Sequence, residues 1–322
     1  MTFLDARPAL RSFAFAAVAA AGLLFSAFAN AAPPPAQKSF ASPEEAVKSL
    51  VLALRTGHTK AVEPILGPGS GSLLRSGDAV ADQNAREQFL AAYDQANKID
   101  KDENGNVIVE VGKNEWPFPI PLVMTDGRWR FDSKAGAQEI IDRRIGGNEL
   151  NTIDVCLAYV DAQREYATVD RDRNGYLEYA QRFMSSPGKR DGLYWPSPVG
   201  EEESPMGPLM GQAQAKGYDF KQGKPTPYYG YYYRILKAQG PNAKGGAMDY
   251  VFHGHMIGGF ALVAYPASYG SSGIMTFIVN YDGVVYQKNL GPKTTELAEK
   301  MTAYDPDSSW TKVEPPRAAS AN

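Results

Sequence analysis

Oxygen-bearing side chains recur between Asp170 and Gln181 at the spacing of a calcium-binding loop. The segment DRDRNGYLE at 170–178 matches the EF-hand pattern, with oxygen ligands at positions one, three, five, seven and nine and glycine at position six. The expected ligands are Asp170, Asp172, Asn174, Tyr176 through its carbonyl, Glu178 and, at position twelve, Gln181. Because Gln181 is neutral, we expect weak calcium affinity, in the range of about 10⁻⁴–10⁻³ M. The alternative is a turn whose side chains cap backbone amides.

Two further motifs could do chemistry. His253 and His255 lie two residues apart, a spacing that on a strand puts both imidazoles on one face and could chelate zinc. Only Asp249 is close enough in sequence to be a third ligand, so ordinary polar surface is the favoured interpretation. Ser186 and Lys189 have the spacing of a nucleophilic serine motif, but a Pro-Gly pair between them prevents the helical turn that the motif needs. We therefore assign no catalytic residue.

A run of tyrosines at 228–233 could offer a binding surface. On a strand, Tyr229, Tyr231 and Tyr233 share one face, and with Trp195 they could form a platform for a glycan or an envelope protein. Cross-strand aromatic packing that stabilises the sheet is the favoured alternative.

A hydrolase acting on cell-envelope material is the alternative function. It would use carboxylates such as Asp191 or Glu203 near Trp195. Two such carboxylates would have to converge within about 5–9.5 Å across a cleft.

The first half of the chain reads as helices followed by a small antiparallel sheet. Ser42 as cap, Pro43 at the first helical position and Glu45 three residues after the cap predict a helix start. Prolines alternate at 117, 119 and 121, so the strand that contains them should be an edge or bulged segment. We expect helices at 43–55, 59–66 and about 82–96, and strands at 107–111, 116–124 and 129–131.

The second half is expected to hold a sheet with helices on one side, which makes the chain an α+β protein. We predict a long helix at about 149–169, a short helix ending at 184, an irregular stretch at 185–227 and a closing helix at 294–303. Strands are expected at 228–236, 250–256, 260–265 and 274–279, with a hairpin turn at Asp282 and Gly283. The expected domains are 40–145 and 146–313, with a linker at 32–39 and a disordered tail at 314–322.

Residues 1–31 have the pattern of a secretory signal peptide. Arg7 and Arg11 precede an apolar run at 12–28, and Ala-Asn-Ala at 29–31 supplies a cleavage pattern. The alternative is an uncleaved membrane anchor; we favour cleavage, which leaves no membrane span and places the protein in the periplasm or the medium. A single cysteine, Cys156, forms no internal disulfide, and its helical apolar surroundings predict an inert core thiol.

Charge excludes one class of partner. Lys+Arg 33 against Asp+Glu 36 gives a net charge of -3, and the pI is about 5.8. Nucleic-acid binding needs clustered cationic excess, so we expect no nucleic-acid partner.

Several sequence blocks resemble known families. The blocks DAQREY at 161–166, GKRDGLYW at 188–195, SPMGPL at 204–209 and MIGGFAL at 256–262 resemble a bacterial exported family catalogued as a domain of unknown function, DUF2950. That resemblance implies export and no particular catalysis. The segments ALRTGH at 53–58 and GRWRFD at 127–132 resemble the cystatin-like or nuclear-transport-factor-like fold, which implies helices around a curved sheet with a cone-shaped pocket. The hairpin that begins with GIMTFI at 273–278 is similar to pseudopilin-like domains.

Within the cystatin-like resemblance, an enzyme would need a His/Asp pair in the cone. His58 is the only histidine of the first half, and a loop position at a helix end predicts an exposed structural role for it. An apolar cone would favour binding over catalysis. We therefore expect an exported, non-enzymatic protein that binds an envelope ligand or protein partner and has a possible structural calcium ion.

Overall fold

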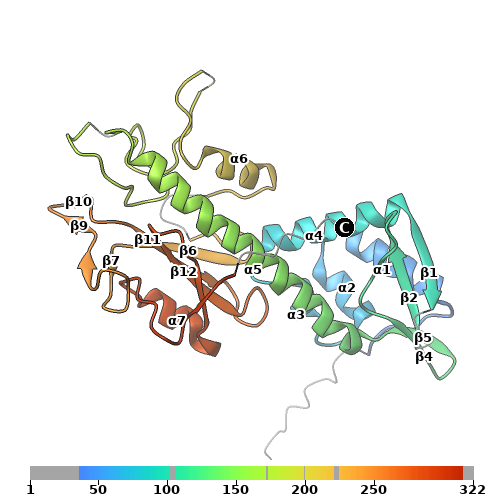
Figure 1. The fold of residues 1–322 in the computed structure, drawn as a ribbon. Coiled ribbons are helices and arrows are strands. Elements are labelled where there is room, and N and C mark those ends of the chain that lie inside the picture. The colour runs from blue at the N-terminus through green and yellow to red at the C-terminus, as the bar shows by residue number, and fades with distance from the viewer. Residues whose placement is uncertain (1–35, 102–105, 172, 199, 221–224, 315–322) are drawn as a thin grey trace, which may run out of the picture. The chain divides into compact units, whose positions relative to one another are not determined.

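The computed structural model describes residues 36–101, 106–171, 173–198, 200–220 and 225–314 (Figure 1). The predicted signal peptide at 1–31, the first half of the linker at 32–39 and nearly all of the tail at 314–322 lie outside the described residues. The described elements are α-helices and antiparallel strands, so the predicted α+β class is confirmed. No helix within the described ranges is both long and apolar enough to cross a membrane.

Four helices open the described chain. They are α1 (Pro43–Arg55), α2 (Thr59–Leu66), α3 (Gly71–Leu74) and α4 (Ala79–Gln95). The predicted start of α1 is confirmed, because the Ser42 hydroxyl accepts the Glu45 amide at 3.2 Å and the Glu45 carboxylate accepts the Ala41 amide at 2.8 Å. Asp78 caps α4 in the same way, accepting the Ala81 amide at 3.0 Å.

The first sheet follows these helices. Its strands are β1 (Asn97–Lys101), β2 (Val107–Val111), β3 (Trp116–Pro117), β4 (Leu122–Thr125) and β5 (Arg128–Phe131), with the order β1-β2-β4-β5 and β3 paired to β2. The predicted strand at 116–124 is interrupted because its prolines remove ladder donors. Leu122 and Phe131 pair across the sheet and are fully buried against α1 and α2.

Helix α5 (Ser133–Tyr166) connects the two halves (Figure 1). It begins well before the predicted residue 149, because Asp132 caps it through the Ala135 amide at 3.1 Å and Ile140 and Ile141 pack on the first core. The predicted boundary at 145 and 146 falls inside this helix, and residues 35–322 form one compact unit. The division into domains 40–145 and 146–313 therefore stays a prediction.

The second sheet has the order β14-β13-β12-β11-β6. Its strands are β6 (Tyr231–Leu236), β11 (Ala261–Pro266), β12 (Met275–Asn280), β13 (Tyr286–Asn289) and β14 (Thr311–Lys312). The predicted hairpin between β12 and β13 is confirmed, with Ile278 opposite Tyr286. Two short pairs, β7 (Ala238–Gln239) with β8 (Met248–Asp249) and β9 (Val251–Phe252) with β10 (His255–Met256), lie beside it.

Helices cover both faces of this sheet, whereas we predicted helices on one side. Tyr233 of β6 bonds Thr152 of α5 at 3.3 Å, and its neighbour Arg234 donates to the carbonyls of Ala298 and Met301 at 2.5 and 2.6 Å. Ala298 belongs to α7 (Thr294–Glu299), which follows the 3₁₀ turn η1 (Gly291–Lys293). Adjacent strand residues point to opposite faces, so α5 and α7 lie on opposite sides.

Two helix predictions in the second half are wrong. No helix follows the loop at 170–175, where residues 176–184 are irregular and pair with neighbouring loops. The stretch at 185–227 instead contains α6 (Gly207–Ala215), whose Ala213 packs with Val155 of α5. Cys156 lies fully buried in the second core, and burial raises the pKa of its thiol, in accord with the predicted inert core role.

Candidate functional site

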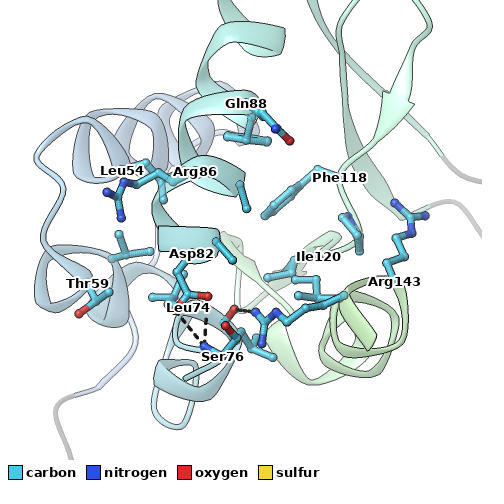
Figure 2. Close-up of a pocket in the computed structure, with 18 of the residues that line it drawn as sticks. Leu54, Thr59, Leu74, Ser76, Asp82, Arg86, Gln88, Phe118, Ile120 and Arg143 are labelled. Carbon is cyan, nitrogen blue, oxygen red and sulfur yellow. Dashed lines mark hydrogen bonds between the residues drawn. The ribbon is translucent and has the colours of Figure 1, made fainter. Parts of the chain in front are cut away.

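The first half encloses a cavity of about 620 Å³ (Figure 2). That volume lies within the range of about 300–1,000 Å³ that small-molecule sites occupy. Its walls come from α1, α2, α3, α4 and α5 and from the segment 116–120 that follows β2. Most lining side chains are apolar, including Leu54, Leu74, Phe89, Phe118 and Ile120.

The cavity follows from how α4 and the proline segment pack. No residue of α4 is fully buried, although Phe89, Leu90, Ala92 and Tyr93 pack against the first core. Residues 118–121 leave the strand after Phe118, whose amide still donates to the Val109 carbonyl at 2.7 Å, so Phe118 and Ile120 form a wall opposite α4 (Figure 2). Phe118 and Phe89 meet at 5.2 Å between ring centroids. Helix α4 and the wall of Phe118 and Ile120 therefore touch at this aromatic contact, and the cavity lies beside it.

Three arginines and one aspartate are among the cavity's lining residues. Arg143 pairs with Glu139 at 2.6 Å and lies over the Trp116 ring at 4.8 Å. Arg144 donates to the Leu73 carbonyl, and burial lowers its pKa against the opposing effect of Asp82.

The remaining arginine has no such partner. The guanidinium of Arg86 makes no hydrogen bond or ion pair with another residue in the described part of the chain, and Figure 2 shows it at the wall near Leu54.

His58 and Asp82 both line the cavity but do not form a catalytic pair. Both carboxylate oxygens of Asp82 accept the Ser76 amide, at 3.1 and 2.9 Å (Figure 2). His58 is the exposed residue that precedes α2, and no hydrogen bond joins it to Asp82 within the described ranges. The exposed position predicted for His58 is confirmed.

The predicted calcium loop has the conformation of a tight turn. The Asp170 carboxylate accepts the amides of Asn174 and Gly175 at 3.0 and 2.9 Å. Arg173 and Gly175 have φ values of 59° and 91°, the left-handed region that such a turn requires at its fourth and sixth positions. Asp172 lies outside the described residues. The Asn174 side-chain oxygen likewise accepts the Tyr176 amide at 2.9 Å, so these oxygens cap backbone amides of the loop.

The later ligand positions of the loop contact the β9–β10 pair as well as the loop itself. The Glu178 carboxylate accepts the Asn174 side-chain amide and the Met256 backbone amide, the latter at 3.1 Å, and it lies 3.2 Å from the His255 ring nitrogen. Gln181 donates to the Gly254 carbonyl at 2.6 Å and accepts from Lys237 at 2.9 Å, so its amide is turned away from the loop. Tyr176 stacks on His255 at 3.9 Å between ring centroids. No group of three or more His, Cys, Asp or Glu side chains suited to a metal lies within the described part of the chain.

The expected aromatic platform is not a surface. Tyr231 is fully buried and Trp195 is 5 % exposed. Tyr231 donates to the Met275 carbonyl at 3.0 Å, and Tyr233 donates to Tyr228 and Thr152. The Tyr229 hydroxyl contacts Lys216. These residues therefore do not form an exposed platform, because α5 covers the face of β6 on which the side chains of Tyr231 and Tyr233 lie.

The other two carboxylate candidates, Asp191 and Glu203, lie in different surroundings. Asp191 accepts the Ser186 amide and hydroxyl at 2.7 and 2.8 Å, which fixes a local turn. Glu203 lines a smaller polar hollow of about 320 Å³, together with Trp195 and Glu201.

His253, of the histidine pair considered as a zinc site, has a left-handed φ of 49° in the turn between β9 and β10 and is exposed.

Sequence reasoning missed the individual residues of the large cavity. The cystatin-like resemblance implied a cone-shaped pocket in this half but named none of the lining residues, and that resemblance stays a prediction. No sequence motif marks Arg86 and Arg144, because they lie on separate helices and come to line one cavity only in the folded chain.

Comparison with known proteins gives one match. A family model described as "Protein of unknown function (DUF2950)" matches residues 37–313. No curated protein and no solved structure matches the chain significantly. The match covers most of the chain and nearly all of its described residues. The chain therefore belongs to the DUF2950 family of proteins of unknown function.

Proposed function

We propose that this protein binds an apolar or amphipathic small molecule of the cell envelope in the α1–α5 cavity. The apolar lining of the roughly 620 Å³ cavity carries this proposal. Apolar ligand surface that leaves water contributes about 25 cal/mol per Å². Apolar side chains make up most of the lining, beside a smaller set of polar and charged groups. The commitment of both Asp82 oxygens to the Ser76 amide supports binding rather than acid–base catalysis.

Export is part of the proposal. The pattern of residues 1–31 supports removal of a signal peptide and a periplasmic or secreted location. A protein in that compartment has envelope lipids and their breakdown products as available ligands, and it acts as a binder without covalent chemistry.

Filling the cavity is expected to abolish binding of an apolar probe. Ala85 lines the cavity on α4 yet is exposed, so an indole at this position has room to occupy the cavity without disturbing the core. We expect N-phenyl-1-naphthylamine to bind the protein with a blue-shifted, enhanced emission, and Ala85→Trp to weaken this binding at least tenfold. Fluorescence titration measures both.

The matched control for this test is Ala91→Trp. Ala91 is exposed on the same helix and lies outside the cavity lining. The Ala91→Trp variant should bind the probe with the same affinity as the unmodified chain. Equal loss in both variants, or unchanged binding in Ala85→Trp, would place the probe elsewhere and count against the cavity as the site.

We also propose a structural calcium ion in the loop at 170–178. The Asp170 carboxylate and the left-handed residues Arg173 and Gly175 support it. Glu178 is already bonded to Asn174 and to the β9–β10 pair, and Gln181 also contacts that pair, so the proposed ion has few ligands and weak affinity, at about 10⁻³ M. In this proposal the ion holds the loop against the end of α5.

Removing one charge from the loop is expected to abolish calcium stabilisation. Asp170→Asn keeps an oxygen that accepts the Asn174 amide but loses the negative charge that calcium needs. We expect millimolar calcium to raise the melting temperature of the chelator-treated chain and to leave that of Asp170→Asn unchanged. Asp161→Asn, at an exposed position on α5, should respond as the unmodified chain does. A calcium-dependent rise in melting temperature that persists in Asp170→Asn would contradict the proposed site.

A further inference from the structure

Positive charge is concentrated at the large cavity although the whole chain is acidic. Arg86, Arg143 and Arg144 line it against the single carboxylate of Asp82, whereas the chain as a whole has a net charge of -3. An apolar cavity has no need of three arginines for its own stability, because a buried or half-buried cation costs hydration energy unless it is paired. The lining therefore has an unbalanced cationic character.

The three arginines differ in how their charges are compensated. Arg143 is paired with the Glu139 carboxylate. Arg144 donates to the Leu73 carbonyl, with Ser72 and Ser271 as longer contacts at 3.5 and 3.4 Å, and all three acceptors are neutral. Arg144 is therefore held in place without a carboxylate in contact with it.

Arg86 is the arginine that remains available to a ligand. Its guanidinium is half-buried at the cavity wall and has no hydrogen-bonding or ion-pair partner in the part of the chain that the structure describes. The nearest acid on its helix face, Asp82, is bonded to the Ser76 amide. Figure 2 shows Arg86 on the α4 side of the cavity, on the opposite side from Arg143. A ligand anion at the wall would give Arg86 the charged partner that the protein does not supply.

We propose that the cavity selects single-chain amphiphiles with an acidic head group, holding the apolar chain among Leu54, Phe89, Phe118 and Ile120 and the anionic head at Arg86. This inference rests on the proposed binding function and names its ligand class. The cavity volume suits one chain of drug-like size, and the arginines supply the charge complementarity for a carboxylate or a phosphate monoester.

The head group is tested with ligands that share one chain. Dodecanoate, dodecan-1-ol and dodecyltrimethylammonium, kept below their micelle concentrations, are used to displace N-phenyl-1-naphthylamine from the full chain. We expect dodecanoate to bind at least tenfold more tightly than dodecan-1-ol, and dodecyltrimethylammonium to bind most weakly. Arg86→Gln should remove most of the preference for the acid and change dodecan-1-ol binding less than twofold.

A matched variant and the alternative outcomes make the test decisive. Arg130→Gln, at an exposed position on β5 outside the cavity, should keep the preference for the acid. Equal binding of dodecanoate and dodecan-1-ol, or a preference for the acid that survives in Arg86→Gln, would overturn the head-group inference and leave the proposed binding function intact. Failure of all three ligands and of the naphthylamine probe would overturn both. Thermal melting of each variant checks that the fold is retained.

Discussion

Replacing Asp78 by alanine is expected to lower the free energy of unfolding by about 3–7 kcal/mol. Asp78 is 1 % exposed and caps α4 through the Ala81 amide. Its other oxygen accepts the Tyr218 hydroxyl and the Gly230 amide, both at 2.9 Å. The substitution removes the helix cap, worth about 1 kcal/mol, and leaves two buried donors without an acceptor, at about 1–3 kcal/mol each. Urea unfolding followed by circular dichroism measures the loss.

A surface carboxylate provides the control for Asp78. Asp94 pairs with Arg55 on the exposed side of α4 and contacts no buried donor. Asp94→Ala should cost less than about 1 kcal/mol, as exposed ion pairs contribute little. Equal effects of the two substitutions would contradict the buried role of Asp78 as the link between α4, Tyr218 and the turn before β6.

The same glycine-to-alanine change is expected to have opposite effects at two positions of α5. At Gly136 an added Cβ would lie 2.5 Å from the Pro119 carbonyl oxygen and 2.7 Å from Ile120 Cα. Backbone atoms cannot rotate away, so α5 must move off the proline segment, at a cost of about 3 kcal/mol. At Gly146 a Cβ meets nothing within 4 Å. There alanine should stabilise the helix by about 0.5–1 kcal/mol.

Unfolding curves of the two variants test this contrast directly. A destabilised Gly136→Ala beside a stabilised Gly146→Ala agrees with one continuous helix that packs against Pro119 and Ile120. Stabilisation in both variants would show that α5 does not approach the proline segment as described, and destabilisation in both would contradict a continuous helix through residue 146.

Much of the fold could be predicted from capping residues and prolines, because these residues determine the backbone conformation within a few positions of themselves. Ser42 and Glu45 marked the start of α1, and the alternating prolines marked the interruption between β3 and β4. The start of α5 could not be predicted in the same way. We predicted a start at about residue 149, whereas packing of Ile140 and Ile141 on the first core accompanies a helix that begins at Ser133.

The burial of the tyrosines shows a second limit of pattern reasoning. Alternation along β6 correctly separated Tyr231 and Tyr233 from their neighbours, but it could not tell whether a helix covers their face. The contact of Tyr233 with Thr152 of α5 settles that point. The residues that line the cavity could not be predicted, because they come from helices and strands far apart in the sequence.

Photo-crosslinking of a diazirine-bearing dodecanoate, followed by peptide mass spectrometry, tests the central claim most directly. The claim is that the ligand lies in the cavity of the first half. The account predicts saturable labelling confined to lining segments of that cavity, such as 50–54, 85–92 and 116–120, and loss of that labelling in Ala85→Trp. Labelling confined to the polar hollow around Glu203, or labelling that persists in Ala85→Trp, would contradict it.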